Sequence, residues 1–368
     1  IESLLGRSSV KVNTNLLSKN ITDKVVLVTG AGGSIGSELC RQILFLKPTV
    51  LILIEISEFA LYKIDNELSN LNLFNTTIKP ILCSVTNEKK LSYIFKKFKV
   101  HTIYHSAAYK HVPIVEFNTS EGVINNFFGT LRTARAAIEA NVKIFVLIST
   151  DKAVRPTNTM GVTKRCAEMV LQGLSQDQLT TIFTIVRFGN VLGSSGSVIP
   201  KFKEQISLGG PVTVTNPKMI RYFMTISEAV ELVIQSGTIG KSGEVLLLDM
   251  GSPIKIIDLA KKMIRLSGLE VKDKSNPDGD IEILYSGTRP GEKLFEELLI
   301  DDDALPTEHP KIMRAIEKSL EINDILKIVD SLEVAIDRFD NQRVRELLIE
   351  AVPEFEPQCE IEDLLFKS

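Results

Sequence analysis

The chain has 368 residues, of which 44% are hydrophobic and 24% charged, and its formal net charge is −3. This is the composition of a globular protein with a large core, long enough for two domains or for one domain with an appendage, and its charge gives no indication of a general affinity for nucleic acid. The four cysteines lie far apart with no C-x-x-C pair, which argues against a metal site or a disulfide scaffold and favours a reducing compartment.

Residues 1–22 are mostly polar and show no sustained period, so we expect a lead-in segment there. From residue 24 onward, apolar strands alternate with amphipathic helices. Strands are expected at 25–29, 50–54, 78–82, 102–105, 144–149 and 181–187. Helices are expected near 34–46, 58–70, 88–98, 119–140 and 159–175. This alternation predicts a doubly wound α/β fold, a parallel sheet with helices on both faces.

The first strand ends in a glycine-rich turn of the kind that binds a dinucleotide. Gly30, Gly33 and Gly36 have the spacing G-x-x-G-x-x-G, and Ser34 and Ile35 begin the helix that follows. Glycines permit the tight turn and let the backbone approach a pyrophosphate, which then lies at the positive N-terminal end of the helix. These residues are therefore predicted to bind a cofactor.

The second strand ends in Glu55, about 20 residues beyond the glycines, where a carboxylate can accept hydrogen bonds from a ribose diol. A carboxylate at this position repels a 2′-phosphate, so NAD is predicted as the cofactor in preference to NADP. The alternative is a simple glycine turn followed by a solvated glutamate. The agreement of strand, turn, helix and acid disfavours it.

After residue 190 the regular alternation is broken by many glycines and prolines, and helical patterns return only at 227–236, 256–267 and 319–350. Loop-rich sequence at the carboxyl edge of a parallel sheet usually builds the substrate side of an enzyme. We expect a dinucleotide-binding domain at 23–190, a smaller substrate-binding lobe at 191–310 and a helical tail at 311–368.

Titratable side chains follow the fifth strand, at the sheet edge where ligands bind in this class of fold. The strand leads into Thr150, Asp151 and Lys152, and Met160 and Lys164 then lie one helical turn apart on a shared face. Spacing alone leaves other interpretations open. The Asp-Lys pair could be a surface ion pair, the threonine could bond local backbone, and the second lysine could be solvated.

Several motifs together resemble the extended short-chain dehydrogenase/reductases that act on nucleotide sugars. Besides the glycine turn, they are HSAAYKHVP at 105–113, NFFGT at 126–130, STDKAVRPTN at 149–158, RFGNVLG at 187–193 and RPGEK at 289–293. The resemblance covers residues 22–300. It is closest to the long, membrane-anchored 4,6-dehydratases of bacterial polysaccharide biosynthesis that act on UDP-N-acetylglucosamine.

One position departs from most of that superfamily, in which a tyrosine four residues before the lysine takes the proton of a sugar hydroxyl. The position is Met160 here, and a thioether cannot titrate. The long-form dehydratases are similar in having methionine there. Resemblance to them implies that Thr150 and Asp151 are the nearest candidates to handle the C4 hydroxyl, and that the configuration at C5 is retained.

The resemblance assigns further roles. Lys164 would hydrogen-bond the nicotinamide ribose, while Asp151 and Lys152 would be the acid and the base of the elimination. Because an acid must hold a proton and a lysine base must lose one, we expect both pKa values to be displaced toward neutrality. The remaining expected contacts are Ala107 and Ala108 with the cofactor, and Lys110, His111, Asn126, Asn190, Arg221, Arg289 and Glu292 with the substrate.

The two arginines in that set are the expected diphosphate ligands, because guanidinium groups bind phosphate oxygens in pairs. Either arginine could instead form a surface salt bridge. His111 could likewise be structural and satisfy a loop carbonyl.

Three functions remain open. The first is NAD-dependent 4,6-dehydration of UDP-N-acetylglucosamine to a UDP-4-keto-6-deoxy-N-acetylhexosamine, for a bacterial surface glycan or glycoprotein. The second is a UDP-N-acetylhexosamine 4-epimerase, which shares the first hydride step but needs no acid at C6. The third is a non-catalytic dinucleotide-binding regulator. The absence of the tyrosine and the presence of Asp151-Lys152 favour the first.

No apolar run approaches the ~20 residues that a membrane helix needs, so we expect this stretch of chain to be soluble. The opening residues 1–7 resemble the segment that joins membrane helices to the catalytic domain in long-form relatives. The resemblance therefore implies a natural protein anchored with this region at the cytoplasmic face of the inner membrane. It also implies a homo-oligomer.

Overall fold

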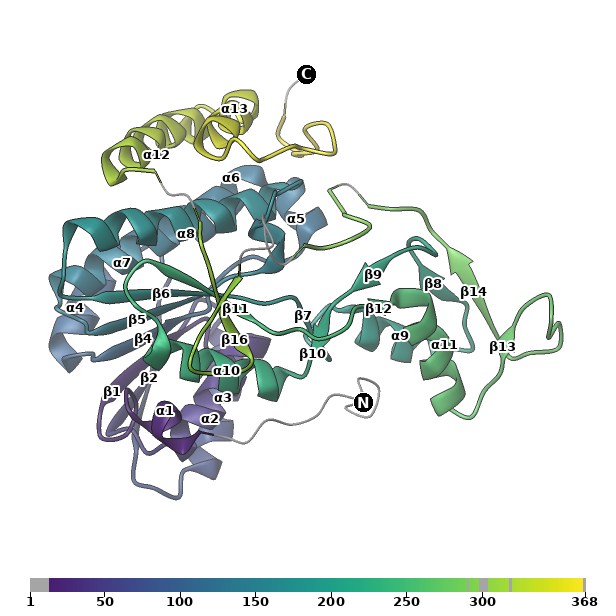
Figure 1. The fold of residues 1–368 in the computed structure, drawn as a ribbon, viewed down its shortest axis with the longest axis horizontal. Coiled ribbons are helices and arrows are strands. Elements are labelled where there is room, and N and C mark those ends of the chain that lie inside the picture. The colour runs from purple at the N-terminus through teal and green to yellow at the C-terminus, as the bar shows by residue number, and fades with distance from the viewer. Residues whose placement is uncertain (1–12, 290, 298–303, 318–319, 367–368) are drawn as a thin grey trace.

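The computed structural model describes residues 13–289, 291–297, 304–317 and 320–366. Its centre is a nine-stranded sheet in the order β15-β16-β11-β6-β5-β4-β1-β2-β3 (Figure 1). The strands are β1 (Val25–Thr29), β2 (Val50–Glu55), β3 (Thr77–Leu82), β4 (Thr102–His105), β5 (Ile144–Ile148), β6 (Ile182–Arg187), β11 (Glu244–Leu248), β15 (Ala304–Pro306) and β16 (Ile312–Ala315).

The sheet is parallel from β3 to β11, and at its other edge β16 pairs antiparallel with both β11 and β15. The strand order reverses between β1 and β4, so the crevice between their carboxyl ends is the topological switch point where ligands bind. The doubly wound parallel sheet predicted from the sequence is confirmed.

Helices cover both faces of the sheet because alternate strand residues point to opposite sides. In β1, Leu27 belongs to one buried cluster, whereas Val26 and Val28 belong to the other. The first cluster is covered by α4 (Glu88–Phe98), α7 (Gly129–Glu139) and α8 (Thr159–Asp177). The second is covered by α2 (Ser34–Phe45), α3 (Glu58–Leu71) and α10 (Ile226–Ile239).

Two predicted helical stretches are subdivided. The stretch at 119–140 consists of α6 (Thr119–Gly122), a π-helical segment η2 (Val123–Phe128) and then α7. The tail pattern at 319–350 is two helices, α12 (Ile322–Asp337) and α13 (Asn341–Ala351), packed over α8 in Figure 1. The break has a local cause, since Phe339 has a φ of 56° and the Asp340 carboxylate accepts from the amide of Arg343 to cap the second helix.

The lobe predicted to form the substrate side lies beyond the carboxyl edge of the sheet (Figure 1). A third buried cluster holds it together. Its elements are α9 (Val198–Ser207), β8 (Val212–Val214), β9 (Ile220–Arg221), β12 (Ile254–Lys255), α11 (Ile256–Leu266), β13 (Val271–Lys272) and β14 (Ile281–Tyr285). A short pair, β7 (Asn190–Val191) with β10 (Phe223–Met224), joins it to the main sheet.

The chain crosses the expected domain limits more than once. Within 191–310 it returns to the large sheet as β11, and the expected helical tail begins with β16. In the lead-in segment, α1 (Thr14–Ser18) packs on α10 and buries Leu17, while residues 1–12 lie outside the described part of the chain. None of the helices in the described ranges is both long and apolar enough to cross a bilayer.

Candidate active site

The turn between β1 and α2 forms a cradle that only glycine permits. Gly30 has a φ of 63°, and a Cβ there would lie 2.8 Å from the Cα of Ala107 at the end of β4. A Cβ on Gly36 would lie 2.0 Å from the Gly30 carbonyl oxygen. Ser34 and Ile35 open α2 directly behind this turn, so the free amides of the helix N-terminus face the switch point. The cradle fits a pyrophosphate.

Glu55 ends β2 with its carboxylate held in place by backbone amides. One oxygen accepts from Gly32 N at 3.0 Å, and the other accepts from Ile56 N at 2.9 Å and Ser57 N at 3.1 Å. Together with Gly30, Gly33, Ala107 and Ala108, this carboxylate lines a cavity of about 260 Å³. The position suits hydrogen bonds to a ribose diol.

A second cavity of about 440 Å³ continues from the first and brings the predicted cofactor and catalytic residues together. The predicted residues that line it are Gly30, Gly33, Ser34, Ile35, Gly36, Ala108, Lys110, His111, Thr150, Lys152, Met160, Lys164 and Asn190. Tyr109, Ser194 and Ser195 also line it and were not predicted. Ser195 reaches across the glycine turn, where its amide donates to the Ser34 hydroxyl at 3.1 Å.

The run after β5 forms a short 3₁₀ turn, η3 (Asp151–Ala153), with its charges turned inward. Asp151 Oδ1 accepts from Thr150 Oγ1 at 3.0 Å and from Lys152 Nζ at 2.9 Å. The aspartate is fully buried, and its Oδ2 has no hydrogen-bond partner within the described ranges. The Lys152 ammonium group also lies 3.5 Å from Asn190 Oδ1. The alternative of a surface ion pair is therefore excluded.

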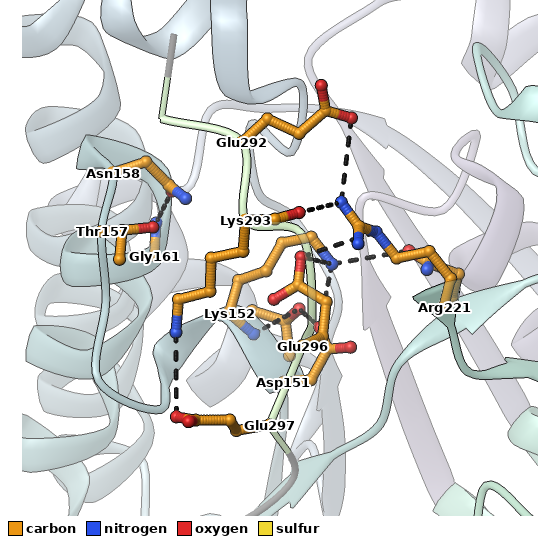
Figure 2. A network of polar contacts seen from close by, with 12 residues as sticks. Asp151, Lys152, Thr157, Asn158, Gly161, Arg221, Glu292, Lys293, Glu296 and Glu297 are labelled. Carbon is orange, nitrogen blue, oxygen red and sulfur yellow. Dashed lines mark hydrogen bonds and ion pairs between the residues drawn. The ribbon is translucent and has the colours of Figure 1, made fainter. Parts of the chain in front are cut away.

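A second carboxylate that the sequence pattern did not predict completes this cluster. Glu296 Oε1 lies 3.5 Å from Lys152 Nζ and 3.7 Å from Arg221 Nε, as Figure 2 shows. Its side chain is 3% exposed. The only sequence signal was its place four residues beyond Glu292. Since 291–297 is not helical, that spacing did not indicate that it turns inward.

The two lysines of the site have opposite pKa displacements. Burial alone would lower the pKa of Lys152, but the negative charges of Asp151 and Glu296 more than offset this and leave it raised. Burial lowers the pKa of Lys164 to about 8, while its ammonium group donates to the Ile148 carbonyl at 2.8 Å. The expectation that the pKa of Lys152 moves toward neutrality is wrong for this arrangement.

Met160 and Lys164 are positioned by the start of α8. The Asn158 carboxamide caps this helix by accepting from Gly161 N at 2.8 Å, and the Glu116 carboxylate at the end of α5 (Val112–Glu116) accepts from the Thr159 hydroxyl at 2.8 Å. Met160 is 3% exposed and lines the larger cavity beside Lys164. It presents a thioether where a proton-transferring phenol would otherwise lie.

A buried ionic network fixes the strand ends beneath the site. Glu168 on α8 accepts from Ser149 Oγ at 2.6 Å and from Arg187 Nε at 2.8 Å, which links the ends of β5 and β6. Burial would raise the pKa of Glu168, but the charges of Arg187 and Arg165 lower it to about 2. The carboxylate is therefore ionised and holds the two strand ends together.

Arg221 belongs to the site and not to the surface, since it is 7% exposed. It donates to the carbonyl oxygens of Ile220 at 2.7 Å, Leu294 at 3.1 Å and Lys293 at 2.6 Å, and it lies 3.8 Å from Glu292 Oε1. This excludes the surface salt-bridge alternative for this arginine. It also places the segment around 291–297 against the strand-end cluster.

Four predicted substrate residues line neither cavity, namely Arg221, described above, and Arg289, Glu292 and Asn126. Arg289 is exposed, and its amide donates to Glu292 Oε2 at 3.1 Å. Glu292 itself contacts Arg221. Asn126 is fully buried and holds the Tyr109 backbone, accepting from its amide at 2.7 Å and donating to its carbonyl at 2.9 Å. In this structure Asn126 therefore shapes the loop after β4.

Lys110 and His111 lie on that loop and face the larger cavity. Burial lowers the pKa of Lys110, and burial together with the neighbouring Lys110 charge lowers the pKa of His111. The His111 ring packs against Gly196, where a Cβ would lie 2.4 Å from Cε1. Among the described residues, no three His, Cys, Asp or Glu side chains are grouped to hold a metal ion.

The fold and the arrangement of these residues define an extended short-chain dehydrogenase/reductase. Residues 26–317 match the family described as polysaccharide biosynthesis protein, and the chain belongs to that family. The comparisons thus confirm the family resemblance that the motifs indicated.

Individual relatives agree with this assignment. The capsular polysaccharide biosynthesis protein CapD of Staphylococcus aureus is 51% identical over 315 residues, which cover 85% of this chain but only 51% of CapD. The structure of Pen from Bacillus thuringiensis is 35% identical with a TM-score of 0.72, and the match covers 80% of this chain and 90% of that one. A UDP-glucose 4-epimerase of Rickettsia akari is 32% identical over 286 residues, covering 76% of this chain and 79% of the epimerase.

Proposed function

We propose that the chain is an NAD-dependent 4,6-dehydratase that converts UDP-N-acetylglucosamine to a UDP-4-keto-6-deoxy-N-acetylhexosamine with retention at C5. The observation that carries this proposal is the cluster of Thr150 and Lys152 around the buried Asp151, which lies beside Met160 at the edge of the cavity that the glycine cradle shares. A hydride transfer alone needs one group to take a hydroxyl proton. An elimination needs an acid and a base on adjacent carbons as well.

The cofactor is NAD, held by the glycine cradle and by Glu55, whose negative charge disfavours a 2′-phosphate. NAD supplies the acceptor for the C4 hydride and the donor that returns it to C6. Lys164 orients the nicotinamide ribose from the floor of the larger cavity. Its lowered pKa lets it exchange a proton near neutral pH.

The residues at the end of β5 handle the protons. As the hydride leaves C4, the proton of the C4 hydroxyl passes to Asp151, directly or through Thr150, and once C4 is a ketone the proton on C5 becomes acidic. Lys152 takes that proton while Asp151 gives one to the departing C6 hydroxyl, so that a C=C bond forms as water leaves. Asp151 Oδ2 has the free hydrogen-bonding capacity for that proton.

The nucleotide is recognised on the substrate side. Arg221 is the diphosphate ligand in this proposal, which requires its guanidinium group to exchange its bonds to the Lys293 and Leu294 carbonyls for phosphate oxygens, and Arg289 and Glu292 supply neighbouring contacts. CapD, the relative named for capsular polysaccharide biosynthesis, supports a role in a bacterial surface glycan. Assembly as a homo-oligomer, anchored at the cytoplasmic face of the inner membrane, belongs to the same proposal.

An epimerase is the second candidate, favoured by the 32% identity to the Rickettsia UDP-glucose 4-epimerase. A non-catalytic regulator is disfavoured because it would need no buried acid-base cluster beside the dinucleotide cavity. Incubation with UDP-N-acetylglucosamine and product analysis by mass spectrometry and NMR separates the three functions. Loss of one water with a C4 ketone supports dehydration, UDP-N-acetylgalactosamine indicates epimerisation, and NAD binding without any product indicates a regulator.

A further inference from the structure

Glu296 lies between the two halves of the site and has no part in the chemistry described above. Its Oε1 is 3.5 Å from Lys152 Nζ and 3.7 Å from Arg221 Nε. Figure 2 shows the carboxylate between these two cations. Its other oxygen, Oε2, is buried without a hydrogen-bond partner in the described part of the chain. A buried carboxylate with a spare oxygen is costly, so its position calls for a function.

The backbone that carries Glu296 is fixed on both sides. The Gly291 carbonyl accepts from Asn158 Nδ2 at 3.0 Å, and Lys293 Nζ donates to the Val154 carbonyl at 3.1 Å. On the other side, the Lys293 and Leu294 carbonyls accept from Arg221. The contacts of residues 291–294 therefore hold Glu296 against Asp151 and Lys152 at the end of β5.

Glu296 is the carboxylate that lies near both cations of this cluster. Asp151 and Glu296 face Lys152 and Arg221, and all four side chains are largely or fully buried. Without Glu296, Lys152 would keep Asp151 as its carboxylate partner, and Arg221 would keep the more exposed Glu292 at 3.8 Å. An arginine does not release its proton in a protein, so Lys152 is the group that would respond.

We propose that Glu296 is a positioning residue for Lys152. Its carboxylate fixes the ammonium group between β5 and Arg221 and sets the pH at which that group releases its proton. The inference rests on the proposed function, in which Lys152 must lose a proton to act as a base. Because the same carboxylate contacts Arg221, Glu296 also connects the diphosphate side of the site to the base.

The surrounding charges are consistent with this role. Asp151 and Glu296 raise the pKa of Lys152 against the effect of burial, and Arg221 opposes them. The other titratable groups that line the larger cavity beside Lys152 are Tyr109, Lys110, His111 and Lys164. Those next to Glu296 along its own segment are Glu292, Lys293 and Glu297. None of the cavity-lining groups is a carboxyl group, and Glu292 and Glu297 lie near Arg221 and Arg155 instead of Lys152, so none of them replaces the negative charge of Glu296.

The test is a pH titration of lysine side chains by NMR in the protein without substrate. The lysines are labelled with ¹³C and ¹⁵N, and the Lys152 resonance is assigned by its loss in Lys152→Arg. In the unmodified protein this resonance should titrate at a pH above that of an ordinary lysine. In Glu296→Gln it should titrate at least about one pH unit lower, because an opposite charge at this range shifts a pKa by about one to three units.

Glu297→Gln is the matched control. It removes the same charge one residue away, but its side chain is 43% exposed and lies 3.5 Å from Arg155 instead of Lys152. Its Lys152 titration should match that of the unmodified protein. If Glu296→Gln does not fold, Glu296→Asp replaces it in the test. The shorter side chain keeps the negative charge but holds it farther from Lys152, so the midpoint of the Lys152 titration should fall by a smaller amount.

A Lys152 midpoint that is unchanged in the Glu296 variants, or lowered equally by Glu297→Gln, would overturn the proposal. The titration needs neither substrate nor turnover, so its outcome is separate from that of the proposed function. If the chain is a dehydratase, the rising limb of its kcat/KM profile should also move to lower pH in Glu296→Gln. If kcat/KM instead fell by the same factor at every pH, with no shift of the rising limb, the role of Glu296 would be only structural.

Discussion

The cofactor side and the substrate side of this site are built by different means. The cofactor side consists of a turn, a helix N-terminus and the carboxylate of Glu55, all contributed by neighbouring stretches of sequence and held by backbone amides. The substrate side is a cluster of buried charges, Asp151, Lys152, Arg221 and Glu296, contributed by segments far apart in the chain. Local geometry determines the first, and long-range electrostatics determine the second.

This difference predicts which property is lost when residues on each side are substituted. Steric changes should abolish cofactor binding outright, because the cradle has no room to adjust. Charge changes on the substrate side should leave the cofactor bound and alter chemistry, pH dependence and stability.

The largest effect is expected for Gly36→Ala on the cofactor side. The new Cβ would lie 2.0 Å from the Gly30 carbonyl oxygen, so the turn must open and the cradle is lost. NAD binding followed by calorimetry should fall below detection. The control Gly193→Ala, at a positive-φ glycine with nothing within 4 Å of an added Cβ, should retain cofactor binding. Normal NAD affinity in Gly36→Ala would contradict the assignment of the cradle.

On the substrate side, Asp151→Asn and Lys152→Met should keep NAD binding and lose dehydration. General acid and base groups typically contribute ~10²–10⁴-fold each. Two quantities are measured on the same samples, the turnover of UDP-N-acetylglucosamine and the affinity for NAD. Variants that lose cofactor affinity and turnover together would indicate a structural role for the pair.

The two lysines should also have opposite effects on stability at pH 7. The pKa of Lys164 is lowered in the folded chain, so it costs stability below pH 8 and this cost declines as pH rises toward the unfolded value near 10. Lys164→Met should therefore raise the unfolding free energy at pH 7, by roughly 1–3 kcal/mol before the lost hydrogen bond is counted.

The pKa of Lys152 is raised, so its contribution is stabilising throughout the neutral range and is lost only as pH rises through the folded pKa. Lys152→Met should lower the unfolding free energy, since it leaves two buried carboxylates without their shared cation. Urea unfolding at pH 7 and pH 9.5 measures both variants. If Lys164→Met and Lys152→Met changed the unfolding free energy by the same amount and in the same direction, the predicted difference between the two lysines would be wrong.

A smaller effect is expected for Glu55→Ala. Loss of the carboxylate removes the repulsion of a 2′-phosphate, so the preference for NAD over NADP should fall while the glycine cradle still binds dinucleotide. Competition between the two cofactors in a binding assay measures it. NADP bound as well as NAD by the unmodified chain would contradict the prediction.

The smallest effect is expected for Met160→Tyr. The side chain lines the cavity, but the proposed chemistry proceeds without a phenol at this position. Turnover should change by less than in the Asp151 and Lys152 variants. If turnover in Met160→Tyr rose by as large a factor as it falls in the Asp151 and Lys152 variants, Thr150 and Asp151 would be inefficient at removing the proton of the C4 hydroxyl.

What could be predicted from the sequence follows the same division. The alternation of strands and helices, the glycine turn and Glu55 were predictable because each depends on short-range pattern. The raised pKa of Lys152 was not predicted, because it depends on Asp151 and Glu296 together outweighing burial, and Glu296 folds back from more than a hundred residues away and outside any helix or strand. Asn126 belongs to a motif that the sequence analysis identified, and it was expected to contact the substrate. Its hydrogen bonds to the Tyr109 backbone are tertiary contacts that the motif does not reveal.

The central claim is that the buried cluster after β5 removes a proton from C5 of the sugar. Incubation with UDP-N-acetylglucosamine in deuterated water, followed by NMR of the product, tests it directly. The account predicts one solvent deuterium at C5 of a 4-keto-6-deoxy product, and no such product from Lys152→Met. A product without deuterium at C5, or near-normal turnover in that variant, would contradict it.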